Sequence, residues 1–382
     1  MLVTLLEEEA VPFETLHERY GSLLELVRTL IGVVPNCDPY LEIWPPAFRT
    51  YNVMVPGFLN LPLSIWGLGA PPELLGLGMY VSSRVAECAY CSAHTCSFAL
   101  RRGANPSKIE KAVDEHDPRF SAKDRATISV ARSLARVPTD ITDEQRRTLR
   151  DELGETNAEW IVLGIGMMGF LNKFMDAVGV ELEPETIAEV DGVIAPSGWK
   201  PGKHFADAVE RTSPPRADGV LDKLGVLRLA PSAVSLDRKW TAGVPNCWPE
   251  VGDFLLRTTR HRWPVLSRLR HPSAIRALAT MLRDNLDPRT SVIGIPKKLA
   301  AGAIYAEVAA DESLAKQVEQ LGTAERDEAV TALAKAIAPS PAIVDGAVVD
   351  ACRTLKPKEI VEVVTFVSLL QLVHRLEAYF PG

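Results

Sequence analysis

The residues of this chain best suited to chemistry are two cysteines three positions apart and a histidine three further on: Cys88, Cys91 and His94. On a helix that turns about 100° per residue, the three side chains share one face about 120° wide. A thiol at a helix N-terminus or beside an imidazolium loses its proton more readily than an ordinary thiol. A second thiol nearby can then resolve the sulfur that has reacted. The spacing therefore predicts thiol redox chemistry.

Two other interpretations of these residues stay open. Free cysteines are among the most buried residue types, so the pair could serve packing alone. A zinc site would need Cys96 as a fourth ligand, but His94 and Cys96 are two residues apart and point about 200° apart around a helix. We favour the redox pair over both, and we expect Cys96 to pack in the core.

Glu87 directly precedes the pair. If one helix runs continuously through the motif, the Glu87 carboxylate lies between Cys91 and His94 and one turn from Cys91, where it would orient His94 or take its proton. If the helix instead begins at Cys88, Glu87 points elsewhere. We carry Glu87 as a candidate catalytic residue together with Cys91, Cys88 and His94.

Charge and the N-terminus limit the partners and the compartment. The formal net charge of -7 argues against nucleic acid or an anionic membrane as the main partner, since both need a concentrated basic surface. The first nine residues lack a basic region and turn acidic at once, unlike a signal peptide. Only three of the six cysteines are clustered, unlike a disulfide framework. We therefore expect a cytoplasmic protein.

The chain is predicted to contain two copies of one structural unit. The segment VPNCDP at 34–39 recurs as VPNCWP at 244–249, with five identities in six positions. Residues 124–131 have a counterpart at 326–333, and the closing stretch 159–178 has one at 359–379. Cys37 and Cys247 occupy the same place in the two copies, and we expect both to serve packing. Because 302–307 corresponds to the stretch before the cysteines and contains no Cys or His, we expect only the first copy to be active.

The pattern of apolar residues predicts an all-α fold. Residues 122–135 and 143–152 have apolar residues at helical spacing, and strand signals are nearly absent. We expect a helical domain at 1–185, a Pro- and Gly-rich linker at 186–218 and a second helical domain, without the CxxC motif, at 219–382. The apolar stretch 161–171 is too short to span a bilayer and is expected to be a buried helix. Its glycines at 164, 166 and 169 match a dinucleotide pattern but follow no strand, so no nucleotide site is predicted.

The motif around the two cysteines resembles that of the alkylhydroperoxidase D and carboxymuconolactone decarboxylase superfamily. The resemblance rests on Ser83-Arg84, on the segment 88–95 and on Arg102-Gly103-Ala104, and it covers about residues 63–183. It implies a peroxidatic Cys91, a resolving Cys88 and His94 as proton relay. It also implies a tandem duplicated form of the alkylhydroperoxidase D-like helical domain, an external thiol or dithiol reductant, no metal, flavin or nucleotide cofactor, and a homo-oligomer with fewer chains than its unduplicated relatives.

The sequence departs from the peroxidase pattern at three places. Well-known members have the histidine four residues after the second cysteine, whereas His94 is three after Cys91. The usual glutamate twelve residues before the first cysteine is Gly76, and the histidine that some members have between the cysteines is Tyr90. These departures are expected to lower the efficiency of peroxidase turnover.

The sequence thus predicts a thiol oxidoreductase that reduces a hydroperoxide or a disulfide. The alternative is a non-redox lyase or hydrolase of the same fold that acts on a small organic acid, and a third hypothesis is a scaffold in which the duplication serves assembly. We expect a small-molecule substrate, and neither nucleic acid nor a membrane as partner.

Overall fold

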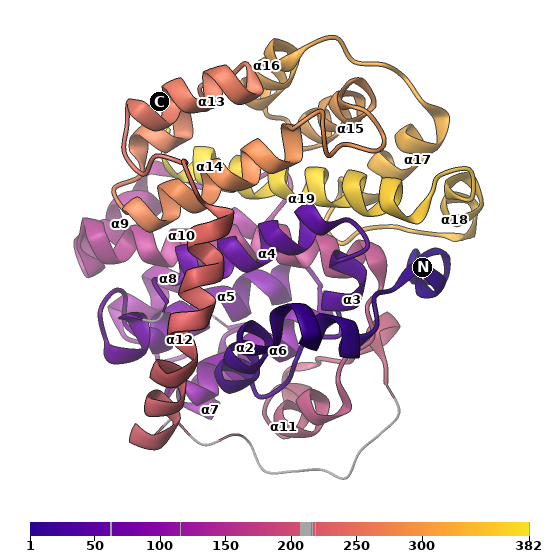
Figure 1. The fold of residues 1–382 in the computed structure, drawn as a ribbon. Helices are drawn as coiled ribbons and strands as arrows, with labels where there is room; N and C mark the ends of the chain where they lie inside the picture. The colour runs from indigo at the N-terminus through magenta and orange to yellow at the C-terminus, as the bar shows by residue number, and fades with distance from the viewer. Residues whose placement is uncertain (62, 115, 207–214, 216, 218, 382) are drawn as a thin grey trace.

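The computed structural model describes residues 1–61, 63–114, 116–206, 215, 217 and 219–381. Within these ranges the regular structure is entirely helical, as the sequence predicted. Figure 1 shows the C-terminal half, in orange and yellow, lying against the N-terminal half, in indigo and magenta, while helix α12 runs along the N-terminal half. One contiguous hydrophobic core contains residues of both halves.

The first half contains eleven α-helices among its described residues. They are α1 (Val3–Leu6), α2 (Phe13–Ile31), α3 (Asp38–Leu41), α4 (Pro45–Phe58), α5 (Pro72–Val85), α6 (Ala89–Arg101), α7 (Pro106–Lys111), α8 (Ala122–Ala135), α9 (Asp143–Leu153), α10 (Glu155–Val178) and α11 (Pro184–Ile194). Short 3-10 turns lie at Glu7–Glu9, Leu63–Trp66, Ala195–Ser197 and Gly202–His204. The predicted helices at 122–135 and 143–152 are confirmed, and capping boxes at Ser121 and Thr142 begin them.

The second half repeats much of this order. It contains α12 (Val220–Trp240), α13 (Glu250–Thr259), α14 (Pro272–Leu286), α15 (Ile295–Val308), α16 (Glu312–Leu321), α17 (Glu328–Ile337), α18 (Gly346–Cys352) and α19 (Pro357–Tyr379), with a 3-10 turn at Pro264–Arg268. The pair α15 and α16 matches α5 and α6 closely: α5 and α15 each have 14 residues, and a residue with positive φ, Glu87 or Ala310, precedes the next helix in each copy.

Equivalent helices of the two halves pack on each other. Helix α10 packs against α19, and α4 packs against α14. Gly57 of α4 approaches Ala277 of α14 so closely that a Cβ at Gly57 would lie 2.5 Å from the Ala277 Cβ. Contacts between equivalent elements are what a symmetric dimer makes across a two-fold axis, so the chain packs like a dimer joined into one polypeptide.

Two buried basic side chains show the same pairing. Lys173 of α10 donates hydrogen bonds to the carbonyls of Ala338 and Pro339, just after α17. Arg375 of α19 donates to the carbonyl of Ala135 at the end of α8, at 3.2 Å, and to Ser82 Oγ at 2.8 Å. Each side chain satisfies carbonyls that a helix end leaves without partners, in the opposite half of the chain.

The glycines of α10 are packing positions. A Cβ at Gly164 would lie 2.6 Å from Leu75 of α5, and one at Gly169 would lie 2.8 Å from the Arg375 side chain. Helix α10 is long and apolar enough to cross a membrane by length and composition, but its apolar window is entirely buried inside the protein. The expected buried helix is thus observed, and the glycine pattern serves close helix packing.

The predicted linker begins with ordered structure. Helix α11 occupies its first part and packs against α6. His204, further along the same segment, has its side chain buried against the first half. Residues 207–214, 216 and 218 of the predicted linker lie outside the described residues. The first part of the segment therefore completes the first helical unit.

Candidate active site

The helix that carries the cysteine pair begins at the pair itself. Helix α5 ends at Val85, Glu87 has a φ of 55°, and Cys88 is the N-cap of α6. This left-handed backbone at Glu87 turns the chain between the two helices, so the condition for a catalytic Glu87 is not met. Its side chain is exposed. Glu87 as a catalytic residue is therefore a wrong prediction, and we remove it from the site.

Cys88 sits where its sulfur is stabilised as an anion. The thiol is buried, and Sγ accepts a hydrogen bond from the Cys91 backbone N–H at 3.4 Å. Burial alone would raise the pKa of Cys88, but the hydrogen bond with Cys91 and the positive charge of His204 lower it to about 6. The helix N-terminus favours the anion as well. Cys88 is therefore mainly a thiolate at neutral pH.

The cation beside Cys88 is His204, which the sequence analysis did not single out. Its Nδ1–H donates to the carbonyl of Val180 at 2.5 Å, and its Nε2 lies 3.7 Å from Asp176 Oδ1. Burial would lower the pKa of His204, but Asp176 and the Cys88 thiolate raise it to about 9. Lys203 Nζ holds Asp176 from the other side at 2.8 Å. No sequence signal indicated His204, because it lies in a Pro- and Gly-rich segment far from the motif.

Cys91 differs from Cys88 in both charge and access. Burial, together with the hydrogen bond and negative charge of Cys88, raises the pKa of the Cys91 thiol well above its usual value. Cys91 nevertheless lines a pocket, whereas Cys88 does not line that pocket. We expected one sulfur to be both ionised and open to substrate. The structure gives the lowered pKa to Cys88 and the contact with the pocket to Cys91. Neither cysteine is in a disulfide, so the structure shows the dithiol form.

The pocket at Cys91, here called the thiol pocket, is almost wholly apolar. It encloses about 580 Å³ of empty space, part of it open to solvent. Its walls come mainly from α4, α6 and α10, and they include Tyr51, Phe98 and the methionines at 79, 167, 168 and 175. Methionine fills irregular gaps and adapts its shape, so these walls suit an apolar small molecule. His94 lies in the same wall as Cys91.

His94 is held by a carboxylate on its far side. Its Nε2 lies 2.7 Å from Glu183 Oε2, while its buried Nδ1 has no hydrogen-bond partner. Burial would raise the pKa of Glu183, but the charge and hydrogen bond of His94 and the backbone N–H of Asn36 keep it below its usual value. Because Glu183 is ionised, Nε2 of His94 must donate, and Nδ1 is left to exchange a proton.

Glu183 connects this histidine to solvent. Glu183 lines a second cleft, together with His17, Arg28 and Asn36. This polar cleft and the thiol pocket have no lining residue in common, and the contact between Glu183 and His94 links them. A carboxylate–imidazole pair between a polar cleft and an apolar pocket can pass protons without admitting bulk water. The sequence placed Glu183 only at the edge of the first domain and gave it no role.

The structure explains two of the departures from the superfamily pattern. A Cβ at Gly76 would lie 2.6 Å from the Ala99 Cβ and 2.8 Å from the Ala99 Cα, so α5 and α6 leave no room for a glutamate there. Tyr90 donates its hydroxyl to Glu183 Oε1 at 2.8 Å, and its ring lies 4.6 Å from the ring of His94. Gly76 thus permits close packing, and Tyr90 positions the carboxylate–imidazole pair.

The second copy keeps the geometry and loses the thiols. Asp311 is the N-cap of α16, as Cys88 is of α6, and its Oδ1 accepts from the backbone N–H of Leu314 at 2.9 Å. A buried histidine, His374, faces this anion with its Nδ1 2.6 Å from Asp311 Oδ2. An anionic N-cap beside a histidine therefore occurs in both copies, but only the first has sulfur.

The remaining cysteines fall into two groups. Cys96 and Cys352 are buried, as expected for packing, and Cys37 is buried in the wall of the thiol pocket. Cys247 is exposed and donates to Glu250 Oε2 at 3.3 Å, so its predicted packing role is wrong. The repeated hexapeptide lies on the site in the first copy and at the surface in the second.

Fold and site together define an all-helical protein of two similar units, of which the first carries a buried dithiol. No family model and no curated protein matches the chain. Among solved structures, the chain is similar to the debrominase Bmp8, with a TM-score of 0.43 and 20% identity over 48% of this chain and 96% of that one. A Bmp8 cysteine-to-alanine variant in complex with 2,3,4-tribromopyrrole matches equally, at 19% identity. This likeness is too distant to establish a shared fold or activity, so the superfamily resemblance stays a prediction.

Proposed function

We propose that this chain is a dithiol oxidoreductase that reduces an apolar hydroperoxide at Cys91. The observation that carries the proposal is the placement of Cys91 with His94 in the wall of an apolar pocket, while the Cys91 backbone N–H donates to the buried Cys88 thiolate. An oxidisable thiol, a base to deprotonate it and a second sulfur to resolve it are then in one place. External thiol or dithiol compounds would restore the reduced pair.

The residues divide the reaction as follows. Nδ1 of His94 takes the proton of Cys91, and the Cys91 thiolate attacks the outer oxygen of the hydroperoxide. The O–O bond breaks, and His94 gives the proton to the leaving alkoxide, which departs as an alcohol. Cys91 is then a sulfenic acid; the Cys88 thiolate attacks its sulfur, the S–S bond forms, and the departing hydroxide takes a proton from His94 and leaves as water. Two electrons have passed from the dithiol to the peroxide.

His204 and Glu183 serve the two ends of this sequence. His204 keeps Cys88 anionic, so the resolving thiolate is present before the sulfenic acid forms. Glu183 lets His94 recover its proton from the polar cleft rather than from the thiol pocket. The mechanism thus keeps bulk water away from the sulfenic acid while still supplying protons.

The proposal is tested by turnover of cumene hydroperoxide with a dithiol reductant. We expect Cys91→Ser to abolish turnover and Cys88→Ser to stop after a single reaction, with a sulfenic acid that dimedone traps. The matched control is Cys247→Ser, an exposed cysteine outside the site, which should turn over like the wild type. Turnover by Cys91→Ser at the wild-type rate, or no hydroperoxide consumption by the wild type, would refute the proposal.

One observation favours a second candidate, a non-redox lyase or hydrolase acting on a small organic acid. The unpartnered Nδ1 of His94, with Glu183 behind the ring, is also the arrangement of a general base. In that case His94→Asn would lose the activity on the acid and Cys91→Ser would keep it. Loss of activity in both variants would instead favour the thiol mechanism.

A further inference from the structure

A second apolar cavity lies next to the thiol pocket. It encloses about 970 Å³ of empty space, part of it open to solvent, between α2, α4 and α12. We call it the α12 groove. Its lining is aliphatic and aromatic apart from a few polar groups such as Asn52 and Asp237. A concave apolar lining with a few polar groups is typical of a ligand site.

The α12 groove and the thiol pocket have five lining residues in common: Ile31, Tyr51, Val55, Leu59 and Phe98. These side chains face one cavity on one side and the other cavity on the opposite side. The two spaces are therefore separated by at most one layer of side chains. Ile31 and Val55 are only partly buried, so rotamer changes of these two side chains can open the layer between the two cavities.

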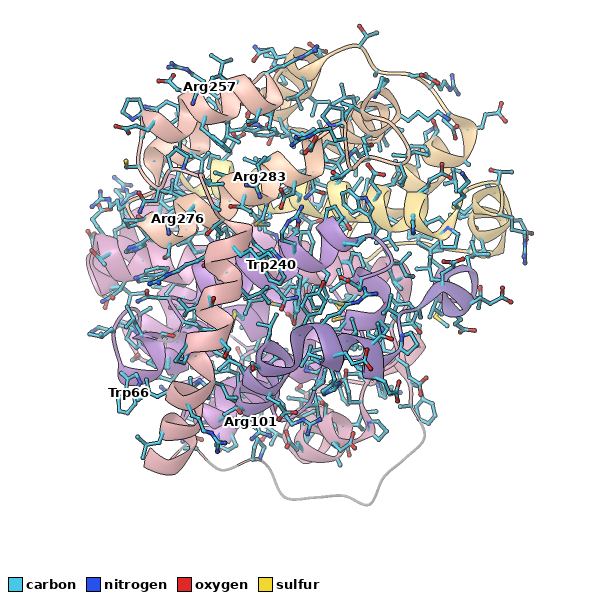
Figure 2. The ribbon with its side chains drawn as sticks, in the orientation of Figure 1. Trp66, Arg101, Trp240, Arg257, Arg276 and Arg283 are labelled. Carbon is cyan, nitrogen blue, oxygen red and sulfur yellow. The ribbon has the colours of Figure 1, made fainter. Side chains whose placement is uncertain are left out.

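Helix α12 belongs to the second half of the chain but closes a cavity of the first half. It packs along α2 and also contacts α4. Figure 1 shows it running along the N-terminal half, and Figure 2 shows Trp240 near the end where it meets α14. The residues that it contributes recur at helical spacing on one face: Val226, Ala230, Ala233, Val234, Asp237 and Trp240.

We propose that the α12 groove and the thiol pocket form one elongated site for a hydroperoxide with a long apolar chain. The reactive group lies at Cys91 and the chain lies in the groove. This inference rests on the proposed function and specifies its substrate class. An apolar chain suits the groove because no charged side chain other than Asp237 lines it, and each additional buried methylene is expected to improve affinity about fourfold.

The site also gives the duplication a role in binding. A single unit would present the α12 groove as an open apolar surface, whereas α12 covers it. The second half, which has no cysteine at the position of its N-cap Asp311, would thus act on substrate through α12 rather than through chemistry.

The first test compares hydroperoxides of increasing chain length, from butyl to hexadecyl. For the wild type we expect kcat/KM to rise about fourfold per added methylene until the chain fills the groove or the diffusional limit is reached. Ala233→Trp fills the groove from a residue that does not line the thiol pocket, and it should remove the rise with chain length. The matched control Ser235→Trp places the same side chain on the exposed face of α12.

The second test measures binding without turnover. Parinaric acid, a fluorescent long-chain fatty acid, should bind the wild type and Ser235→Trp equally and should bind Ala233→Trp at least tenfold more weakly. Ala230→Leu, a smaller change on the same face, keeps the test available if Ala233→Trp fails to fold. Equal binding by all variants, or a flat chain-length profile, would overturn the inference. Parinaric acid binding that Ala233→Trp removes, without turnover of any hydroperoxide, would support the groove and refute the peroxidase.

Discussion

At the scale of residues, the site divides one task between two sulfurs. Cys88 carries the charge and is sealed from the thiol pocket, and Cys91 faces the pocket and keeps its proton. The sequence indicated a cysteine pair with redox spacing, but it did not predict which cysteine carries the charge. His204, which lowers the pKa of Cys88, lies in a distant segment.

The charge on Cys88 can be tested directly. We expect the ultraviolet absorbance of a thiolate to appear with a midpoint near pH 6, because His204 and the hydrogen bond from Cys91 hold the pKa of Cys88 there. Below that pH the thiol is protonated and the signal is lost. His204→Gln should move the midpoint up toward 9, the ordinary value, and Cys88→Ser should remove it. A midpoint near 9 in the wild type would contradict the assignment.

Stability alone would not reveal this ion pair. The lowered pKa of Cys88 stabilises the fold above pH 9.0 in full and loses its effect as the pH falls through about 6. The raised pKa of His204 stabilises the fold below pH 6.5 in full and loses its effect as the pH rises through about 9. The two slopes have opposite signs and offset each other between about 6.5 and 9, which is why the spectroscopic measurement is the decisive one.

At the scale of elements, the site depends on the close approach of α5 and α6. Gly76 lets the Ala99 backbone come within the space that a side chain would fill. Cys88, Cys91 and His94 all lie at the start of α6, so this packing fixes their position relative to α10 and the thiol pocket. The α5–α6 contact leaves no room for a glutamate at position 76, and the carboxylate beside His94 is that of Glu183, next to α11.

Gly76→Ala should be destabilising, by about 1 to 3 kcal/mol, because its Cβ would meet backbone as well as side-chain atoms of Ala99. Urea unfolding measures the change. Gly192→Ala of α11 is the matched control, since its Cβ meets nothing within 4 Å, and it should be neutral or slightly stabilising. Equal effects of the two substitutions would show that helix propensity, and not the α5–α6 contact, decides the outcome.

At the scale of the whole molecule, the two halves are joined as a symmetric dimer would be. Helices α10 and α19 pack on each other, and each carries a buried basic side chain that donates to carbonyls of the other half. The core is contiguous across this contact. We therefore expect the two halves to unfold together in one cooperative transition.

Arg375→Met should destabilise the whole chain by at least about 2 kcal/mol, because Ser82 and the carbonyls of Ile165 and Ala135 lose their buried donor. Chemical unfolding followed by hydrogen exchange would detect the loss in α8 as well as in α19. Arg353→Met removes an exposed pair with Asp350 and should change stability by less than about 0.5 kcal/mol. Loss of protection confined to the second half would contradict the dimer-like coupling.

The predicted homo-oligomer is a property at this same scale, and it stays a prediction. A chain that already packs like a dimer has used the α10–α19 and α4–α14 faces internally, so any further assembly must use other surfaces. Light scattering tests this prediction, and a strict monomer would count against it.

The sequence by itself determined the helical class and indicated the duplication and the candidate site of Cys88, Cys91 and His94, because helix periodicity, a repeated hexapeptide and residue spacing are local properties of the chain. It could not determine where α6 begins, and that boundary removed Glu87 from the site. Only the tertiary structure brought His204, Glu183 and α12 to the cysteines. These contacts are decided by how distant segments pack, and neither periodicity nor motif spacing carries that information.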